Sequence, residues 1–349
     1  MAVYSINPLT DPRWDALLAD HPRAAVFHTR GWLQALQKTY GYQPMVLTTS
    51  GPLEPLRNGL VFCQLESWIS GRRLVSLPFS DHCDPLIDSV DDERKLLEAA
   101  LEFARETRCR YTEIRPSLMS WQPVANSWCP SERFRFHALS LQASEQELFS
   151  RMHSDCIRRK VRRAEKERLE YIQGTERPLL HDFYELLVQT RGRHGVPPPP
   201  MEWFRDLFQS MNGCIKIRIA AKDGRPVAAI LTLDFRTTVT YKYGGSDDEY
   251  NHLGGMPFLF WKLIQEARQQ GMRLLDLGRS DEDNPGLITF KNRLGANSDI
   301  ITYWRGSGGH PVSVSPCAQV LGRVGKLLFR SLPRPILIAS GRILYKHAG

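Results

Sequence analysis

Residues 216–246, KIRIAAKDGRPVAAILTLDFRTTVTYKYGGS, carry the clearest strand pattern in the chain. Three runs rich in Ile, Val, Thr and Tyr are separated by a turn at Asp223-Gly224 and by a second turn near Thr237 and Thr238. Branched and aromatic side chains favour extended backbone, and Asp-Gly between two such runs favours a tight hairpin. The segment therefore predicts three consecutive antiparallel strands.

A helix and a further strand come after this segment. Gly254, Gly255 and Pro257 precede the strongly apolar run FLFWKLIQEARQQG, which predicts a helix over 257–270 that stops at Gly271. RLLDLG, which begins at Arg273, reads as a strand. The predicted order is three antiparallel strands, one helix and one strand.

The first half of the chain has a similar outline. We expect a helix over 26–39 entered through Thr29, strands within 44–50, 58–67 and 72–86, a helix over 91–107 and a strand within 110–117. A further strand is expected within 134–142. Arg115 and Arg279 hold the same place after their strands. The pattern predicts an α+β protein with a duplicated domain and a boundary near residue 150.

Composition indicates which partners and which cellular compartment to expect. The net charge of +8 and the sequence pI of about 9.2 favour anionic partners. Seven cysteines, an odd number with no CxxC pair, favour a reducing compartment. The first residues show no secretory signal, and no apolar run approaches the roughly 20 residues of a spanning helix. These features predict a soluble cytoplasmic protein.

The chain resembles the FemAB-like, BioF-like branch of the GNAT superfamily, in which two acyltransferase domains lie in tandem. The segments that carry the resemblance are 26–47, 74–86, 157–171, 242–280 and 286–296. The resemblance implies two GNAT-like domains, 1–150 and 151–309, each a mixed, mainly antiparallel sheet flanked by helices. A basic helical tail, 310–349, would complete the chain. It also implies transfer of an acyl or aminoacyl group to an amine on a cell-envelope or polysaccharide precursor.

The start of the predicted helix 257–270 is the expected donor site. Backbone N–H groups at a helix start lack intrahelical partners and bind phosphate well. The resemblance implies that Gly254 and Gly255 hold the pyrophosphate of an acyl-CoA. The glycines come after YNHL rather than a close copy of the usual motif, so acyl-CoA and aminoacyl-tRNA both remain open as donors. The alternative is a glycine turn that only begins a helix.

Residues 276–296, DLGRSDEDNPGLITFKNRLGA, begin in the predicted core strand and then carry a cluster of charged side chains. Asp276 points to the face opposite its two leucine neighbours, where it could accept the proton of an amine. Arg279 could clamp a phosphate or carboxylate, and Lys291 could add a point charge. The alternative is a surface loop closed by an Asp276–Arg279 ion pair.

Other candidate residues lie in two places. In the loop 80–84, Asp84 is a candidate general base and Asp81 a substrate-positioning group, although an Asp that caps its own turn is the commoner use. No spacing supplies a metal site. Arg115 is a candidate substrate contact by its likeness to Arg279. Tyr241 and Tyr243 are expected on one face of their strand, where Tyr243 could protonate a leaving group or simply join the core.

Two basic segments complete the prediction. A basic helix is expected at about 144–168, and beyond Asp299 the chain contains Lys and Arg but no Asp or Glu. Either segment could contact phosphate, lipid headgroups or tRNA, or could be a solvated helix face. The tail could lie on an anionic membrane or form packing helices. The expected partners are an anionic or lipid-linked acceptor and aminoacyl-tRNA, and the rival function is a non-catalytic module that binds nucleic acid or an anionic membrane surface.

Overall fold

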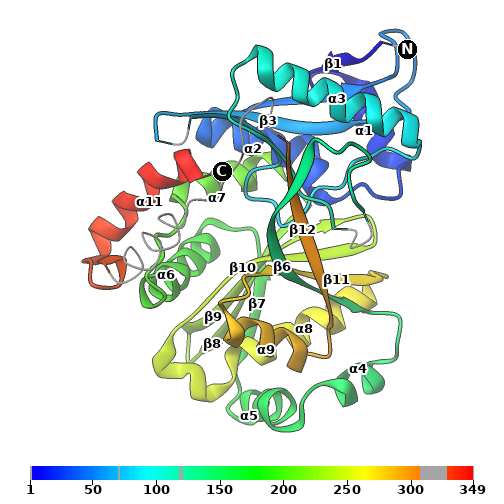
Figure 1. The fold of residues 1–349 in the computed structure, drawn as a ribbon. Coiled ribbons are helices and arrows are strands. Elements are labelled where there is room, and N and C mark those ends of the chain that lie inside the picture. The colour runs from blue at the N-terminus through cyan, green and yellow to red at the C-terminus, as the bar shows by residue number, and fades with distance from the viewer. Residues whose placement is uncertain (1, 70, 118–120, 307–327, 349) are drawn as a thin grey trace. The chain divides into compact units, whose positions relative to one another are not determined.

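The computed structural model describes residues 2–69, 71–117, 121–306 and 328–348, which form two compact units (Figure 1). Unit 1 draws its residues from 1–134, 300–316 and 343–349, and unit 2 from 135–299 and 317–342. Strand β6 (Trp128–Ser140) begins in unit 1 and ends in unit 2, since its second half pairs with β11. The division of the chain into domains at 1–150, 151–309 and 310–349 stays a prediction.

Unit 2 contains the strands predicted from 216–246. After β6 it runs through α4 (Glu145–Arg151), a π-helical turn η2 (Ser154–Arg158), α5 (Arg159–Lys166), β7 (Glu170–Gly174), α6 (Arg177–Arg193), α7 (Met201–Ser210), β8 (Ile215–Lys222), β9 (Arg225–Phe235), β10 (Thr238–Ser246), η3 (Asp248–Leu253), α8 (Gly255–Gln269), β11 (Leu274–Ser280) and α9 (Pro285–Arg293). Its sheet has the order β6-β11-β10-β9-β8-β7. Only the β10–β11 pair in this described order is parallel.

Unit 1 repeats this plan. It contains β1 (Tyr4–Ile6), α1 (Pro12–Asp20), η1 (Val26–His28), α2 (Arg30–Tyr40), β2 (Gln43–Thr48), β3 (Leu60–Ser67), β4 (Gly71–Ser76), α3 (Val90–Glu106) and β5 (Thr112–Ile114), joined by β12 (Asn297–Gly306). The order is β1-β2-β3-β4-β5-β12, and its parallel pair is β4–β5. Each unit thus places a helix between the two strands that pair in parallel, and the predicted α+β class is confirmed.

The basic segment at 144–168 is not the single helix that was predicted. Ser144 and Glu147 form a capping box that begins α4, and His153 Nδ1 accepts from the backbone N–H groups of Asp155 and Cys156. These side chain–backbone bonds begin a second helical segment, so α4 and the η2–α5 segment are separate. Helices α1, α7 and α9 and strands β1, β7 and β12 were also not predicted.

Helix α11 (Arg334–Ala348) forms the described end of the predicted basic tail, while residues 310–327 lie outside the described residues. In unit 2, Leu337 is buried, Arg334 pairs with Glu185, and Arg342 pairs with Glu202 at 2.8 Å. This part of the tail packs as a helix in which Arg334 and Arg342 are matched by acids. In the described part of the chain, no helix is long and apolar enough to cross a membrane.

A buried ion pair fastens α8 to the sheet of unit 2. Arg218 on β8 is 1% exposed, and its guanidinium donates to both carboxylate oxygens of Glu266 on α8 at 2.9 and 3.0 Å. The Tyr171 hydroxyl donates to the same carboxylate, and Arg218 also donates to Thr232 Oγ1. Burial by itself raises the pKa of Glu266, but the hydrogen bonds and charge of Arg218 outweigh it and lower that pKa to about 2.

We expect Glu266→Gln to destabilise the protein by about 3–5 kcal/mol at pH 7, because it leaves the Arg218 charge buried without its partner. The folded pKa of Glu266 lies below the usual value of about 4.3, so its stabilisation is complete above that value and is lost as the pH falls toward 2. The free energy of unfolding, measured in urea from pH 7 to pH 2.5, should therefore converge for the two proteins at the acid end.

Asp91→Asn is the matched control, because Asp91 pairs with Arg94 on an exposed face of α3. An exposed pair contributes little, so this variant should track the wild type at every pH. A Glu266→Gln difference that stays constant from pH 7 to pH 2.5 would contradict the assigned pKa.

Candidate functional site

The sheet of unit 2 opens between β10 and β11. The two strands pair only from Thr238 to Thr240 on β10 and from Leu274 to Asp276 on β11. Both strands lie within the described residues, and β10 continues to Ser246 and β11 to Ser280. Backbone groups beyond the last pair can therefore accept an extended ligand between the strands, in the manner of an added strand.

The opening begins where β11 bulges. The register of β11 against β6 shifts between Asp276 and Arg279. Asp276 is buried, and its Oδ1 accepts from the N–H of Gly278 at 2.7 Å. Lys291 of α9 is 2% exposed and donates to the carbonyl oxygens of Gly278 and Arg279 at 3.1 and 3.0 Å. The structure thus brings Asp276, Arg279 and Lys291 together, and it buries the ammonium that the sequence suggested as a simple added charge.

A second bulge corrects the expectation for the tyrosines. The register of β10 against β9 shifts between Tyr241 and Tyr243, so the two side chains do not share a face. Tyr241 lies edge-on to Phe260 of α8, with ring centroids 5.0 Å apart. Tyr243 is buried against α7, where its hydroxyl accepts from Trp203 Nε1 at 3.0 Å. The prediction of a common face was wrong, and it is Tyr241 that lies on the α8 side.

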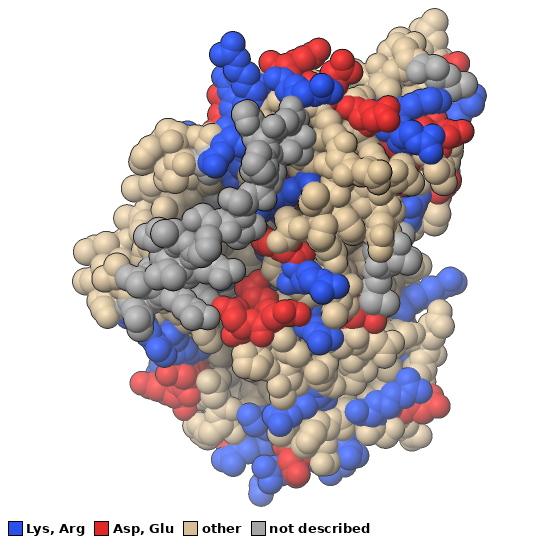
Figure 2. Space-filling view, in the orientation of Figure 1, with Lys and Arg blue, Asp and Glu red and all other residues tan. Residues whose placement is uncertain are grey.

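A cavity of about 310 Å³ lies at the start of α8. Its lining comes from η2, α5, η3, α8 and α9: Cys156, Ile157, Lys160, Asn251, Met256, Pro257, Gly286, Phe290 and Arg293. The first turn of α8 carries no acidic residue and no side-chain cap, while Lys160 and Arg293 bring two positive charges. Figure 2 shows Lys and Arg gathered over the surface where α5 lies. The arrangement suits an anionic group such as a phosphate.

Gly254 and Gly255 lie at this helix start as predicted, but chain packing already explains why they lack side chains. Gly254 has φ +83°, and a Cβ there would lie 2.5 Å from the carbonyl oxygen of Lys160. A Cβ on Gly255 would lie 3.0 Å from Cβ of Ala228. Both glycines let α8 approach its neighbours closely. Their predicted contact with a donor phosphate stays a prediction.

His137 is a residue near Lys291 that the sequence reasoning did not select. It is fully buried on β6, and its Nε2 lies 3.0 Å from Oδ1 of Asn292 on α9. Burial, and then the charge of Lys291, lower the pKa of His137, which therefore stays neutral at pH 7. Lys160 falls in the predicted basic segment 144–168 and Arg293 in the charged stretch 276–296, but which cations line a cavity depends on contacts between distant segments.

Asp81, Asp84 and Arg115 lie together in unit 1. The carboxylate of Asp84 is buried and accepts from the backbone N–H and the hydroxyl of Ser117. The backbone carbonyl of Asp81 accepts from the Tyr303 hydroxyl at 2.6 Å. Arg115 lies over the Tyr303 ring, 5.2 Å from its centroid, and its guanidinium pairs with Glu113 at 2.8 Å. These contacts hold the loop in place, and the predicted catalytic or substrate roles stay predictions.

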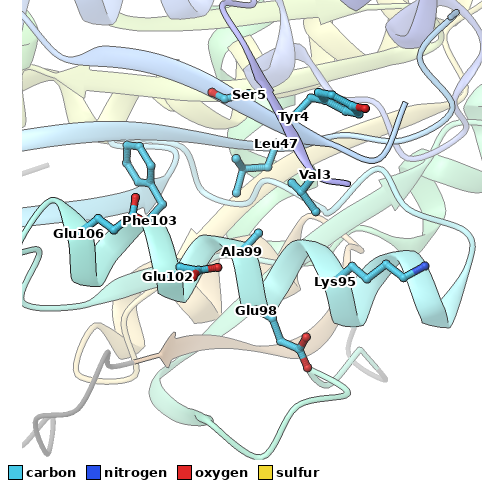
Figure 3. A pocket seen from close by; sticks show the side chains of 10 residues that line it. All are labelled: Val3, Tyr4, Ser5, Leu47, Lys95, Glu98, Ala99, Glu102, Phe103 and Glu106. Carbon is cyan, nitrogen blue, oxygen red and sulfur yellow. The ribbon is translucent and has the colours of Figure 1, made fainter. Parts of the chain in front are cut away.

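A larger cavity, of about 440 Å³, lies in unit 1 between β1 and α3 (Figure 3). Glu98, Glu102 and Glu106 of α3 lie along it, opposite Val3, Tyr4 and Ser5. Its acidic lining suits an anionic substrate poorly, in contrast to the cavity at α8. Among the residues described, no group of three or more His, Cys, Asp or Glu side chains is placed to hold a metal ion.

Comparison with known proteins agrees with this geometry. A family described as an acetyltransferase (GNAT) domain matches residues 153–291. A UDP-N-acetylmuramoylpentapeptide-lysine N(6)-alanyltransferase of Weissella viridescens is 24% identical over 137 residues, which span 38% of this chain and 40% of that protein. The crystal structure of FemX superposes with a TM-score of 0.67 at 14% identity, over 92% of this chain and all of that one.

A tandem GNAT protein from the clavulanic acid biosynthesis pathway has a similar fold, with a TM-score of 0.56 at 13% identity over 89% of this chain and all of that one. The parted strands and the helix start beside them lie within the residues that match this GNAT domain. Over most of its length, the fold of the chain is similar to that of FemX.

Replacing Gly254 should test packing rather than ligand binding. Gly254→Ala should cost about 2–5 kcal/mol of stability, since it combines a left-handed backbone with a clash against Lys160. Gly271→Ala is the control: its φ is +75°, and nothing lies within 4 Å of the added Cβ, so about 1–2 kcal/mol is expected. Urea unfolding measures both, and equal losses would show that the close approach at Lys160 is unimportant.

Proposed function

We propose that the protein transfers an acyl or aminoacyl group to a primary amine on an anionic cell-envelope precursor. The observation that carries the proposal is the opening between β10 and β11, next to a cationic cavity at the start of α8. An extended donor lying between the strands would place its phosphate at the helix start and its reactive carbonyl near the last β10–β11 pair. Asp276 and Lys291 lie at that end of the opening.

The donor is an acyl-CoA thioester or an aminoacyl-tRNA ester, because both carry phosphates and an activated carbonyl. The first turn of α8, Lys160 and Arg293 suit a phosphate of either molecule. The similarity to an alanyltransferase favours the aminoacyl donor. That relative is named for a reaction at the lysine of a UDP-linked muramoylpentapeptide, so an amine on a phosphate-bearing or lipid-linked precursor is the acceptor proposed here.

The reaction needs few protein groups. The amine nitrogen attacks the donor carbonyl carbon, a C–N bond forms, and the C–S or C–O bond to the carrier breaks. We propose that the Asp276 carboxylate receives the proton lost by the amine and that the Lys291 ammonium stabilises the negative carbonyl oxygen. The leaving sulfur or oxygen takes up a proton as it departs. Arg279, beside them, is proposed to hold an anionic group of a substrate.

The residues predicted elsewhere keep narrower proposals. Asp81 and Arg115 remain proposed acceptor contacts and Asp84 a proposed general base, although each of the three also makes a bond that secures its loop or strand end. For Tyr243 the buried bond with Trp203 favours the core alternative over acid catalysis. The rival function is a non-catalytic module that binds nucleic acid or an anionic surface. The exposed charges of α5 are the feature that favours it.

Ligand binding tests the donor site directly. Coenzyme A or unfractionated tRNA should raise the melting temperature of the wild-type protein, since a ligand of the folded state stabilises it by mass action. Lys160→Gln with Arg293→Gln should weaken that binding by about tenfold or more, the scale of one lost charged hydrogen bond. Arg162→Gln with Lys166→Gln is the control, because these exposed residues of α5 do not line the cavity.

Transfer is then measured by mass spectrometry, as a new amide on UDP-N-acetylmuramoylpentapeptide after incubation with charged tRNA or acetyl-CoA. Suppose instead that both double variants weaken tRNA binding equally and that no amide forms from either donor. This result would favour the non-catalytic module. No stabilisation by either donor would contradict the proposed site at α8.

A further inference from the structure

Unit 1 exposes two large apolar side chains on the connection between β3 and β4. Trp68 is 82% exposed and Ile69 is 53% exposed. Ser67 and Gly71 are the last paired residues of this hairpin, so both side chains project from its end. Trp and Ile in folded proteins are mostly buried, and neighbouring exposed ones mark a surface that contacts something else.

The last turn of α11 extends this surface. Trp68 Nε1 lies 3.0 Å from His347 Nε2, and the two rings meet edge to face. Arg73 of β4 donates to the backbone carbonyl of His347 at 2.9 Å. Ile343, one helical turn before His347, is 60% exposed. Trp68, Ile69 and Ile343 together form what we term the hairpin patch, and all three belong to unit 1.

Positive charge surrounds the hairpin patch. Arg110 lies against Gly71, and its backbone N–H donates to the carbonyl of Arg72. Exposed cations of unit 1 on β4, on the connection between α3 and β5 and at the end of α11 include Arg72, Arg108, Arg110 and Lys346. Glu66 pairs with Arg72 at 2.9 Å, and Glu106 is exposed two residues before Arg108, so these four cations still outnumber the two acids. Apolar side chains within a cationic rim match the chemistry of an anionic bilayer surface.

We propose that the hairpin patch docks unit 1 onto an anionic lipid bilayer. Trp68 lies at the headgroup level, where the amphipathic indole is favoured, and the two isoleucines enter the acyl boundary. The cations contact lipid phosphates. This inference does not rest on the transferase proposal. The sequence suggested the basic tail as the membrane contact, but Arg334 and Arg342 of α11 already pair with Glu185 and Glu202. The proposed membrane contact is therefore the hairpin patch and not the body of the tail.

Size argues against a second copy of the chain as the occupant. Three apolar side chains are too few for the roughly 1,200–2,000 Å² of buried surface that stable protein interfaces need. A bilayer has no such requirement, because each inserted side chain and each nearby cation contributes separately. The hairpin patch therefore fits a lipid surface better than a dimer interface.

Vesicle sedimentation of the full-length protein tests the proposal. Wild-type protein should sediment with phosphatidylcholine vesicles that contain phosphatidylglycerol at low salt, and much less with pure phosphatidylcholine or at high salt, because exposed charges are screened. Trp68→Ser with Ile69→Ser should reduce the bound fraction at least tenfold, and Arg108→Gln with Lys346→Gln should reduce it severalfold. The controls are Leu53→Ser, which removes a fully exposed apolar side chain elsewhere in unit 1, and Lys95→Gln.

A second measurement applies even if the double serine variant is unstable. Brominated phosphatidylglycerol should quench part of the tryptophan emission, and Trp68→Phe should remove that part while the protein still sediments. Sedimentation that Trp68→Ser with Ile69→Ser leaves unchanged, or quenching that survives Trp68→Phe, would overturn the proposal. Loss of self-association in the serine variant, without any vesicle binding by the wild type, would assign the patch to a second copy instead.

Discussion

The backbone of β11 leaves its parallel neighbour at the point where it also bulges against β6, and buried peptide groups at such a point must find other partners. Lys291 supplies donors for two carbonyl oxygens, and Asp276 accepts from the N–H of Gly278. The two bonds from Lys291 fix α9 against β11. Because Gly286, Phe290 and Arg293 of α9 also line the cavity at α8, one set of backbone bonds sets both the strand opening and a wall of the candidate donor site.

Helix α8 forms the opposite side of that site, and it is held at both ends. Glu266 near its end joins the buried Arg218 of the sheet, while Gly254 and Gly255 let its start approach Lys160 and Ala228. A helix fixed in this way keeps its N-terminal N–H groups aimed at one place, which favours an anion without any reorganisation. The glycines that resemble a phosphate loop are thus also required by packing.

The two units share a topology but differ in the residues near the end of the second strand of the parallel pair. In unit 1 the guanidinium of Arg115 is held by Glu113 and stacks on Tyr303, and Arg305 joins the same carboxylate. Burial by itself lowers the pKa of Arg115, but the charge of Glu113 and the other partners outweigh it. The net effect raises this pKa and keeps the guanidinium charged. In unit 2, Arg279 lies within β11 instead, where it ends a bulge beside Asp276 and Lys291. Similar strand order therefore supports different chemistry at corresponding positions.

The sequence by itself determined the local elements of this protein. The alternation within 216–246, the cap at Thr29 and the apolar helix after Gly255 depend on residues close together in the chain, so they could be read directly. Tertiary structure decided the rest. A bulge, set by pairing with a different strand, moved Tyr243 away from Tyr241, and Lys291 is buried only because α9 crosses β11. Side-chain direction beyond a bulge and the choice of cations at a cavity depend on segments far apart in sequence, which no local pattern encodes.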